Sequence, residues 1–362
     1  MRLLGIFLLL AAGVTAIAGH ERGHGRGRGR GRLRVKRQSD QEAATYDDAC
    51  NIGFCSVWGA TIGGWGSSYT TVRTPDEFAA AVSGTQEGVI IVEGDLVSAE
   101  GRVIEIGSSK SIVGNPGSCA FSLLLFTQKG NSLSGITLQF SGSRNVILRN
   151  LRIANSPGNP YAAISLNAAR SIWIDHCDIS GLQGPPYLLS IVNGTDYVTV
   201  THNKFHSRGE TIQFPAVNVG HEAESASDAS AKFHISFARN WFATLNKSVE
   251  FRFGTGHFLN NYFDAVKEGI DILSGGKVSV EGSVFEGIGI NKGVKSSDET
   301  GYAAIRDSVF VGGQYGQPEG VTLGDEVEGV EYPYDWYLWE TARVKDGVKR
   351  WAGQSLEFLV WE

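Results

Sequence analysis

Residues 246–263 read NKSVEFRFGTGHFLNNYF and place two cations, Lys247 and Arg252, five positions apart in a strand-like segment. Cationic side chains bind carboxylates, and the planar guanidinium of arginine does so with two parallel hydrogen bonds. A lysine can also act as a general base where burial or a neighbouring cation favours its neutral form. Two cations at this spacing favour a site for an anionic ligand. His257, which follows in the same segment, is a candidate to bind substrate, although its strand pattern favours a structural role.

The same segment has an interpretation without chemistry. Glu250 stands between the two cations, so the charge of Arg252 could be used in an ion pair with Glu250. Lys247 would then be a solvated surface residue.

The elements that must position these residues are short β-rich segments of similar shape, which recur from residue 145 onward. They read NVILRNLRI, SIWIDHCDI, YVTVTHNKF, HISFARNWF, HFLNNYF, VSVEGSVF and AAIRDSVF. Their last apolar residues follow one another at intervals of 26, 26, 37, 21, 22 and 25 residues. A period in the twenties is typical of a β-solenoid, in which each turn buries its apolar face on the turns above and below.

Polar residues recur two or three positions before the end of several of these segments. In a solenoid such positions stack at the bends between strands, so most are predicted to be structural. They are Asn150, His176, His202, Asn203, Asn240, Asn260 and Asn261.

One helix is well signalled near the start of the repeat region. Thr74 is followed by Pro75 and then by Glu77, which is the pattern of a capped helix N-terminus. A helix that begins here should cover the open N-terminal end of the solenoid, whose strand edge would otherwise be exposed.

The first 37 residues differ in composition from the rest. Arg2, an apolar run and the small residues Ala16 and Ala18 predict a signal peptide at residues 1–18, too short to span a membrane. Residues 19–37 alternate Gly and Arg and end in a dibasic pair, which predicts a basic propeptide that is removed. The alternative is a retained basic arm that binds an anionic polymer.

Removal of residues 1–37 takes away nine Lys/Arg and one Glu, so the formal charge changes from −6 to −14. So acidic a protein is not expected to bind nucleic acid. After signal removal no membrane association is expected either. The prediction is a secreted, extracellular, monomeric protein whose folded domain covers residues 38–362.

Cysteines and glycosylation signals fit the same compartment. Cys50 and Cys55 form the obvious local disulfide, whereas a bridge between Cys119 and Cys177 follows only by elimination. Two Asn-x-Ser/Thr sequons predict glycosylation; they begin at Asn193 and Asn246.

Five segments together resemble one known family: ACNIGFCSVWGATIGG, NVILRNLRIA, SIWIDHCDIS, YVTVTHNKFH and FRFGTGHFLNNYF. They are similar to the pectate and pectin lyases of polysaccharide lyase family one, and the resemblance covers most of residues 46–355. It implies an all-β fold, a single-stranded right-handed parallel β-helix (β-solenoid), here with an N-terminal capping helix. It also implies a pectic polysaccharide as the partner.

The family cleaves polygalacturonate by β-elimination, in which a base removes the proton α to the uronate carboxylate and cations stabilise the enolate-like transition state. By resemblance, Lys247 stands at the position of the proton-abstracting arginine and Arg252 at that of a second, carboxylate-binding arginine. Glu210 takes the place of a substrate-binding lysine. Arg208 is the nearby cation that could compensate, and it is predicted to bind substrate.

The resemblance also implies calcium held by aspartates. Asp175 matches a metal ligand of the family, but Ala162, Pro186 and Ser190 stand where further acids are expected. One carboxylate cannot supply the six to eight oxygens that Ca²⁺ requires. The calcium expected from the family would therefore lack most of its ligands in this chain.

Three functions compete at this point. The first is an active lyase with an altered cleft, which could favour methyl-esterified pectin because the ester needs no calcium to neutralise it. The second is a catalytically inactive β-helix that binds plant cell-wall polysaccharide. The third is a glycoside hydrolase, which would need a pair of facing acids that is not evident. The lyase is favoured over the other two.

Overall fold

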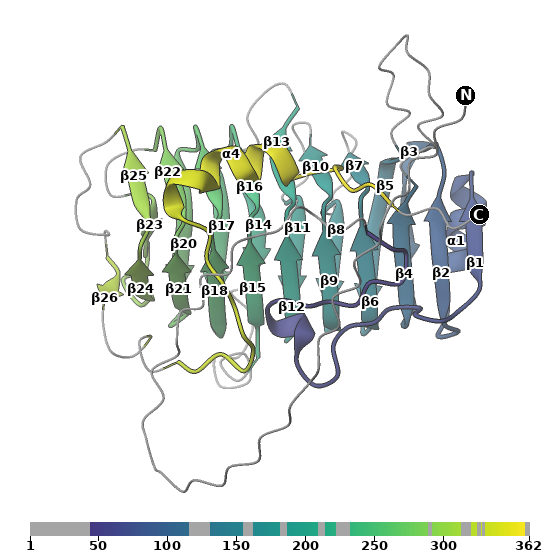
Figure 1. Ribbon diagram of the computed structural model, residues 1–362, viewed down its shortest axis with the longest axis horizontal. Coiled ribbons are helices and arrows are strands. Elements are labelled where there is room, and N and C mark those ends of the chain that lie inside the picture. Colours follow the sequence, from purple (N-terminus) through teal and green to yellow (C-terminus); the bar gives the residue numbers. More distant parts are fainter. Residues whose placement is uncertain are drawn as a thin grey trace, which may run out of the picture. The chain divides into compact units, whose positions relative to one another are not determined.

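The computed structural model describes residues 44–115, 131–154, 162–181, 187–208, 214–221, 232–288, 292–312, 320–323, 327 and 330–358 (Figure 1). All of them fall in one compact unit, Leu33–Glu362. The predicted signal peptide and propeptide lie outside the described residues. Within the described residues no helix is long and apolar enough to cross a membrane.

Parallel strands stack side by side into two large sheets (Figure 1). The first is an 11-stranded sheet. In spatial order it contains β1 (Tyr69–Val72), β2 (Gly88–Val92), β4 (Lys110–Gly114), β6 (Arg144–Arg149), β9 (Arg170–Asp175), β12 (Asp196–Thr201), β15 (His234–Ala238), β18 (Thr255–Leu259), β21 (Lys277–Glu281), β24 (Tyr302–Arg306) and β26 (Thr322–Leu323).

The second sheet has 15 strands in two arms, which meet at the long strand β5 (Ser132–Ser141); β5 also pairs with β3 (Asp95–Glu105). One arm contains β8 (Ile164–Asn167), β11 (Leu189–Val192), β14 (Pro215–Val219), β17 (Lys247–Arg252), β20 (Glu268–Leu273) and β23 (Val294–Lys295). The other contains β7 (Arg152–Ala154), β10 (Asp178–Gly181), β13 (Lys204–Ser207), β16 (Trp241–Ala243), β19 (Tyr262–Asp264), β22 (Val284–Glu286) and β25 (Val309–Val311).

A typical turn of the chain adds one strand to the 11-stranded sheet and one to each arm of the other, as β9, β10 and β11 do. Because each strand pairs with the equivalent strand one turn away, the whole is a parallel β-helix. The predicted β-solenoid is confirmed.

The core consists of apolar side chains that repeat at the same register in successive turns. The predicted anchor phenylalanines stack in one column, with ring centroids 4.4–5.1 Å apart from Phe205 through Phe242, Phe263 and Phe285 to Phe310. Apolar burial along such columns is the main favourable term in folding. The period read from the sequence is therefore the period of the core.

The polar positions before these anchors form the predicted ladder. The amide nitrogen of Asn203 donates to Asn240 Oδ1 at 3.2 Å, and that of Asn240 donates to Asn261 Oδ1 at 3.0 Å. The same side chains bind backbone groups, since Asn240 Nδ2 also donates to the carbonyl of Val200 at 2.8 Å. Buried amides are tolerated here because their donors and acceptors are satisfied one turn away.

Helix α1 (Pro75–Val82) begins where the capping pattern predicts. The Thr74 hydroxyl accepts a hydrogen bond from the backbone N–H of Glu77 at 3.2 Å. Phe78 and Val82 are fully buried against the first strands. Figure 1 shows α1 at the β1 end of the sheets, so the N-terminal capping helix is confirmed.

The segments before β1 and after β26 lie on the outside of the β-helix (Figure 1). The first contains the short helix η1 (Phe54–Ser56), which contacts β9, β12 and β15. The predicted disulfide between Cys50 and Cys55 is present. Cys177 is a buried free thiol, and Cys119, with which elimination would pair it, lies outside the described residues. The second segment contains α4 (Thr341–Trp351), which packs on β19 and β22.

Candidate active site

Strand β17 carries both cations singled out in the sequence. Val249 and Phe251 point into the core and are 1% and 0% exposed. Because side chains alternate along a strand, Glu250 and Arg252 lie on the outer face. Lys247 is the first residue of the strand, and its side chain, 34% exposed, reaches the same face.

The two cations converge on one carboxylate. Lys247 Nζ lies 3.2 Å from Glu250 Oε1, and Arg252 Nη1 lies 3.1 Å from Glu250 Oε2. The structure therefore brings the predicted catalytic pair together. It also confirms the alternative in part, since Arg252 does form an ion pair with Glu250. Lys247, however, is not a solvated residue without partners.

A glycine makes room for Arg252. Gly220, directly after β14, has φ +77°, and a Cβ placed on it would lie 2.8 Å from the Cβ of Arg252. On β14 itself, Asn218 accepts a hydrogen bond from Arg252 Nη1 at 3.3 Å. The guanidinium side chain is only 11% exposed, so its contacts are strengthened by the low dielectric around it.

Further charges surround Lys247. Glu268 Oε2 lies 3.8 Å from Lys247 Nζ and 2.9 Å from Lys295 Nζ, and Lys295 also lies 3.5 Å from Asp271. Burial would raise the pKa of Glu268, but the hydrogen bond from Lys295 and the charge of Lys247 hold that pKa below its usual value. The region is a network of paired charges rather than an open cationic patch.

The residues that pair with Glu250 on successive strands form an outward-facing row, which changes from neutral to charged along the sheet. Glu250 is flanked by Asp271 on β20, and on the other side by Asn218 on β14 and Ser190 on β11. Ser165 on β8 continues the row. The row is neutral and polar over β8, β11 and β14, and charged from β17 onward.

Arg208 has no described contact with Lys247, Glu250 or Arg252. It follows β13, on the other arm of the 15-stranded sheet, and its side chain is exposed. Its backbone N–H donates to the carbonyl of Gly181 at 2.8 Å. The next residues, 209–213, include Glu210 and lie outside the described ranges. Substrate binding by Arg208 stays a prediction.

The prediction for His257 needs correction. His257 lies on β18 of the 11-stranded sheet and is 0% exposed. Tyr332 stacks on its ring at 3.8 Å, and its Nδ1 is 2.7 Å from the hydroxyl of Tyr334. Burial lowers the pKa of His257, against a hydrogen bond with Glu281 that raises it. A side chain covered in this way has no surface to offer a polysaccharide.

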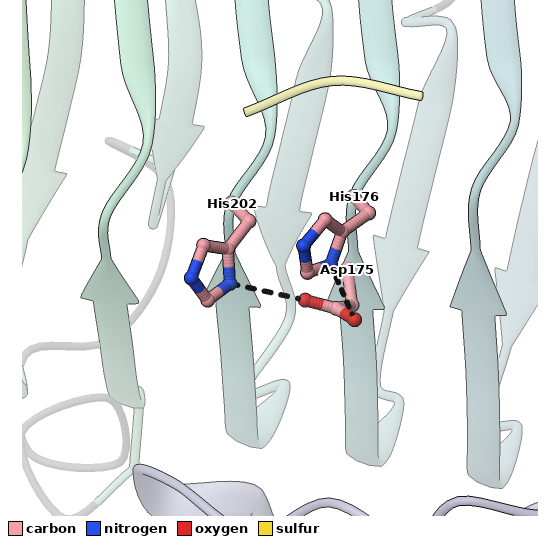
Figure 2. A group of neighbouring side chains, drawn as sticks. All are labelled: Asp175, His176 and His202. Carbon is pink, nitrogen blue, oxygen red and sulfur yellow. Dashed lines mark ion pairs between the residues drawn. The ribbon is translucent and has the colours of Figure 1, made fainter. Parts of the chain in front are cut away.

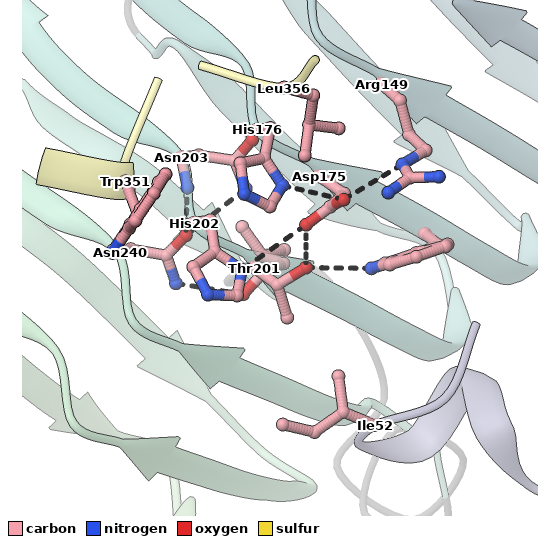
Figure 3. Close-up of polar contacts among 12 residues, drawn as sticks. Ile52, Arg149, Asp175, His176, Thr201, His202, Asn203, Asn240, Trp351 and Leu356 are labelled. Atoms are coloured by element: carbon pink, nitrogen blue, oxygen red, sulfur yellow. Dashed lines mark hydrogen bonds and ion pairs between the residues drawn. The ribbon is translucent and has the colours of Figure 1, made fainter. Parts of the chain in front are cut away.

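Asp175 lies at the end of β9, also in the 11-stranded sheet, and is 1% exposed. Arg149 Nε donates to its Oδ2 at 3.0 Å, and the hydroxyl of Thr201 donates to its Oδ1 at 2.6 Å. Figure 3 shows these contacts converging on the carboxylate. Burial would raise the pKa of Asp175, but the charges of His176 and Arg149 hold it well below its usual range.

Two histidines complete this cluster. His176 Nδ1 lies 2.8 Å from Asp175 Oδ2, and His202 Nδ1 lies 3.5 Å from Asp175 Oδ1 (Figure 2). The imidazole rings stack with centroids 4.4 Å apart. Burial, and then the neighbouring His176, lower the pKa of His202 to about 3. The C-terminal segment covers the cluster, where the N–H of Gly353 donates to the carbonyl of His202 at 2.7 Å.

Neither group of residues suits calcium. The ligand atoms of Asp175, His176 and His202 lie within 4.8 Å of one another, but they offer nitrogen and a single carboxylate where Ca²⁺ takes oxygens. Stacked, nearly parallel rings also cannot both aim an in-plane lone pair at one ion. At the positions where the family resemblance expects further acids, Ser190 and Ala162 carry no carboxylate, and Pro186 lies outside the described residues. We therefore derive no catalytic step through a metal.

Sequence reasoning missed the partners that hold the two cations. Glu268 and Asn218 come from the neighbouring strands β20 and β14, 21 and 34 residues from the cations that they contact. The solenoid period could have revealed Glu268, because Lys247 and Glu268 are register partners. Asn218 is harder to find, since the turn between β14 and β17 is longer than the others.

The comparisons with known proteins agree with this architecture. A family model described as pectate lyase matches residues 40–354. The chain belongs to the pectate lyase family. Pectate lyase A of Emericella nidulans is 35% identical over 330 residues, which cover 90% of this chain and 92% of that protein. Pectate lyase B of Colletotrichum gloeosporioides is 30% identical, and the alignment covers 87% of this chain and 88% of that protein.

Solved pectate lyases share the fold. A mutant pectate lyase of Bacillus subtilis superimposes with a TM-score of 0.69 at 17% identity, over 87% of this chain and 100% of the other. A pectate lyase of Bacillus sp. N165, solved in complex with trigalacturonate, gives a TM-score of 0.63 at 20% identity, over 84% of this chain and 98% of the other. The pectate lyase fold is thus present over nearly the whole length of those enzymes.

Proposed function

We propose that this member of the pectate lyase family is a secreted polysaccharide lyase that cleaves polygalacturonan or pectin by β-elimination. One observation carries the proposal beyond the family: Lys247 and Arg252 reach the same point on the outer face of β17, where Glu250 joins them. A base and a carboxyl-binding cation within a few ångströms of each other are what the reaction needs.

In this reaction a base takes the proton from C5 of a galacturonyl unit. The electrons of the C5–H bond form the C4–C5 double bond, and the glycosidic oxygen leaves C4 with the electron pair of the broken bond. We assign proton acceptance to the Lys247 amine. We assign to Arg252 the stabilisation of negative charge that develops on the carboxyl group next to C5.

Lys247 must be the neutral amine to accept this proton, so the proton that it holds in its ion pairs with Glu250 and Glu268 first passes to solvent. In the structure its nitrogen contacts Glu250 and, at a longer distance, Glu268. Substrate therefore has to replace at least one of these contacts before the elimination. Arg252 is held by Asn218 as well as by Glu250, so it keeps its place on the face while Lys247 moves.

The test is an absorbance assay for unsaturated uronides on polygalacturonate and on methyl-esterified pectin, with and without a calcium chelator. We expect product to form on at least one polymer, and its rate to be the same with the chelator. Folded protein that gives no unsaturated product on either polymer would refute the lyase proposal.

A second candidate is a catalytically inactive β-helix that binds pectic polysaccharide. It is favoured by the pairing of both cations with Glu250 and by the neutral Ser190 in the row beside them. The same assay separates the two functions when it is combined with a sedimentation assay on insoluble pectin. Binding without product would support the second candidate.

Secretion, removal of residues 1–37 and glycosylation belong to the same proposal. The Cys50–Cys55 disulfide fits an oxidising compartment. Asn193 is exposed and Asn246 is half-buried beside Lys247. Intact-mass measurement of the secreted protein, before and after glycosidase treatment, tests the cleavage site and both glycans. Size-exclusion chromatography with light scattering tests the monomer.

A further inference from the structure

Residues 57–69 connect η1 to the start of β1 on the outside of the β-helix (Figure 1). They display three aromatic side chains to solvent, since Trp58, Trp65 and Tyr69 are 82%, 61% and 54% exposed. Neither indole packs on another aromatic ring within the described part of the chain. Large apolar side chains that stay exposed together mark sites of interaction.

The turn that carries Trp58 is fixed in place. The Cys50–Cys55 disulfide precedes it, the N–H of Thr61 donates to the carbonyl of Cys55 at 2.7 Å, and the N–H of Cys50 donates to the carbonyl of Thr61 at 2.9 Å. Trp58 and Ala60 both adopt left-handed backbone, with φ of 56° and 61°. That conformation is costly for residues other than glycine and persists only where the surroundings impose it. Trp58 is therefore exposed by a defined loop.

The backbone before Trp65 is held on the 11-stranded sheet. Asn145 Oδ1, at the start of β6, accepts from the N–H groups of Ile62 and Gly63, both at 2.9 Å. Its Nδ2 donates to the carbonyl of Gly63 at 3.0 Å. Gly64 then lies directly on β2, where an added Cβ would be 2.1 Å from a carbonyl oxygen. Both indoles are thus presented by rigid backbone, which lowers the entropic cost of binding.

Two arginines lie along the edge of the sheet beside this segment. Arg144 and Arg170 begin β6 and β9, are register partners and are exposed. Arg144 is adjacent in the chain to Asn145. The guanidinium of Arg170 lies 4.5 Å from the ring centroid of Tyr197, whose ring is 6.4 Å from that of Phe54 in η1. No acid in the described ranges forms an ion pair with either arginine.

We propose that Trp58 and Trp65, together with Arg144 and Arg170, form a second binding site for galacturonan. The hydrogens on C3, C4 and C5 of a galacturonyl ring lie on one face, and this face packs on an indole. The carboxylate of the unit accepts hydrogen bonds from a guanidinium. The combination of exposed rings and unpaired cations therefore fits an anionic polysaccharide.

This site is separate from the one on β17, which lies in the other sheet. It takes no part in the elimination and instead holds the protein on a long polymer. The inference rests on the proposed function only for the choice of polymer. Tyr69 is left out of the site because its hydroxyl donates to Asp47 at 2.8 Å, and that acid would repel a uronate.

Affinity electrophoresis of the full secreted protein, in native gels that contain polygalacturonate, measures binding apart from turnover. The double variant Trp58→Ala/Trp65→Ala should bind about tenfold more weakly than the wild type. Arg144→Gln should weaken binding about threefold and make it less sensitive to salt. Both losses should recur in a Lys247→Ala background, because they do not depend on the β17 site.

Matched variants separate ring stacking from other effects. Trp58→Phe keeps a ring on the same backbone and should retain most of the affinity. Val309→Ala shortens an apolar side chain on β25 that is 45% exposed, and it should leave binding unchanged. Circular dichroism shows that each variant is folded. If the double variant does not fold, Trp65→Ala replaces it, with an expected loss of about threefold.

Unchanged affinity in the folded tryptophan variant would overturn the inference, and so would equal retardation of the wild type by neutral galactan and by polygalacturonate. Self-association in light scattering that Trp58→Ala abolishes would also overturn it, because the occupant would then be a second copy of the chain. Failure of the proposed function looks different. A protein that yields no unsaturated product, but whose binding still depends on Trp58, would refute the lyase and leave the second site supported.

Discussion

At the scale of single residues, the site on β17 depends on a few charges whose partners decide what they can do. Lys247 and Glu250 are three positions apart in the sequence, yet the ammonium and the carboxylate meet on one face. Lys292 offers a useful comparison, because it also lies 3.8 Å from Glu268 but has no described contact with Glu250. Variants of these two lysines can therefore distinguish the loss of a catalytic amine at Lys247 from the loss of a positive charge beside Glu268.

Replacement of Lys247 by alanine should remove lyase activity. The base is lost, and general-base catalysis contributes about a hundredfold to ten-thousandfold in rate. The measurement is kcat on pectin, with circular dichroism to show that the variant is folded. Lys292→Ala is the control and should retain most activity. Full activity in Lys247→Ala would mean that another residue is the base.

The Asp175 cluster should make the protein less stable in acid. Because the pKa of His202 falls to about 3 in the folded state, the unfolded chain takes up the proton first as the pH drops below about 6.5. Stability is then lost between about pH 6.5 and pH 3, by about 2 kcal/mol at pH 5. The lowered pKa of Asp175 acts in the same direction at still lower pH.

His202→Asn tests this pH dependence. Asn150 and Asn260 occupy bends with the same left-handed φ, 55° and 50°, so asparagine fits the backbone at residue 202, where φ is 50°. Urea unfolding at pH 7 and pH 5 should show a smaller loss of stability for the variant than for the wild type. An equal loss in both proteins would contradict the role of His202.

At the scale of elements, the strands are held by columns that run from turn to turn. The phenylalanine column fills the core, and the asparagine ladder satisfies the backbone at the bends. Buried polar groups are costly unless every donor and acceptor has a partner. The ladder therefore fixes the register of each turn on the next one, and through it the position of β17 beside β14 and β20.

Asn240→Ala should destabilise the fold by about 2–4 kcal/mol, because it leaves two buried backbone groups without partners. These are the N–H of Asn203 and the carbonyl of Val200. The free energy of unfolding in urea is the measurement. Asn167→Ala is a control at a partly exposed asparagine and should change stability by no more than about 0.5 kcal/mol. Similar losses in both variants would argue against the ladder.

At the scale of the whole molecule, the C-terminal segment closes over the outer face of the 11-stranded sheet. The hydroxyl of Tyr334 is hydrogen-bonded to the hydroxyl of Ser236 on β15 at 2.8 Å. It also lies 2.7 Å from Nδ1 of His257 on β18. Further along, Asn260 Oδ1 accepts from the N–H of Trp339 at 2.7 Å. This face is therefore occupied by the chain's own segment, which leaves the arm that contains β17 as the candidate substrate face.

Tyr334→Ala should loosen this segment and cost about 2–4 kcal/mol, through lost packing and unpaired polar groups beneath it. Hydrogen exchange should become faster in β15 and β18, and the melting temperature should fall. Asp335→Ala, at an exposed neighbouring position, serves as the control. Unchanged exchange in β15 and β18 would show that the segment does not protect them.

The sequence by itself determined the β-helix, because the solenoid core repeats with the chain: Phe205, Phe242 and Phe263 mark successive turns without any knowledge of coordinates. It also gave the capped start of α1 at Pro75 and the local Cys50–Cys55 disulfide, since both depend on residues close in the chain. It placed Lys247 and Arg252 on one strand. It did not foresee the burial of His257, which depends on a segment some 75 residues later in the chain.

Only the tertiary structure decided the electrostatics of the site. Whether a cation can bind a substrate depends on which carboxylates lie beside it. Glu268 is brought to Lys247 from the next turn of the β-helix, and Glu250 meets Lys247 through the conformation of β17 itself. Strand register converts a period in the sequence into distances of a few ångströms. Coulomb interactions fall off with those distances, so the charge state of the β17 face could not be obtained from the sequence order alone.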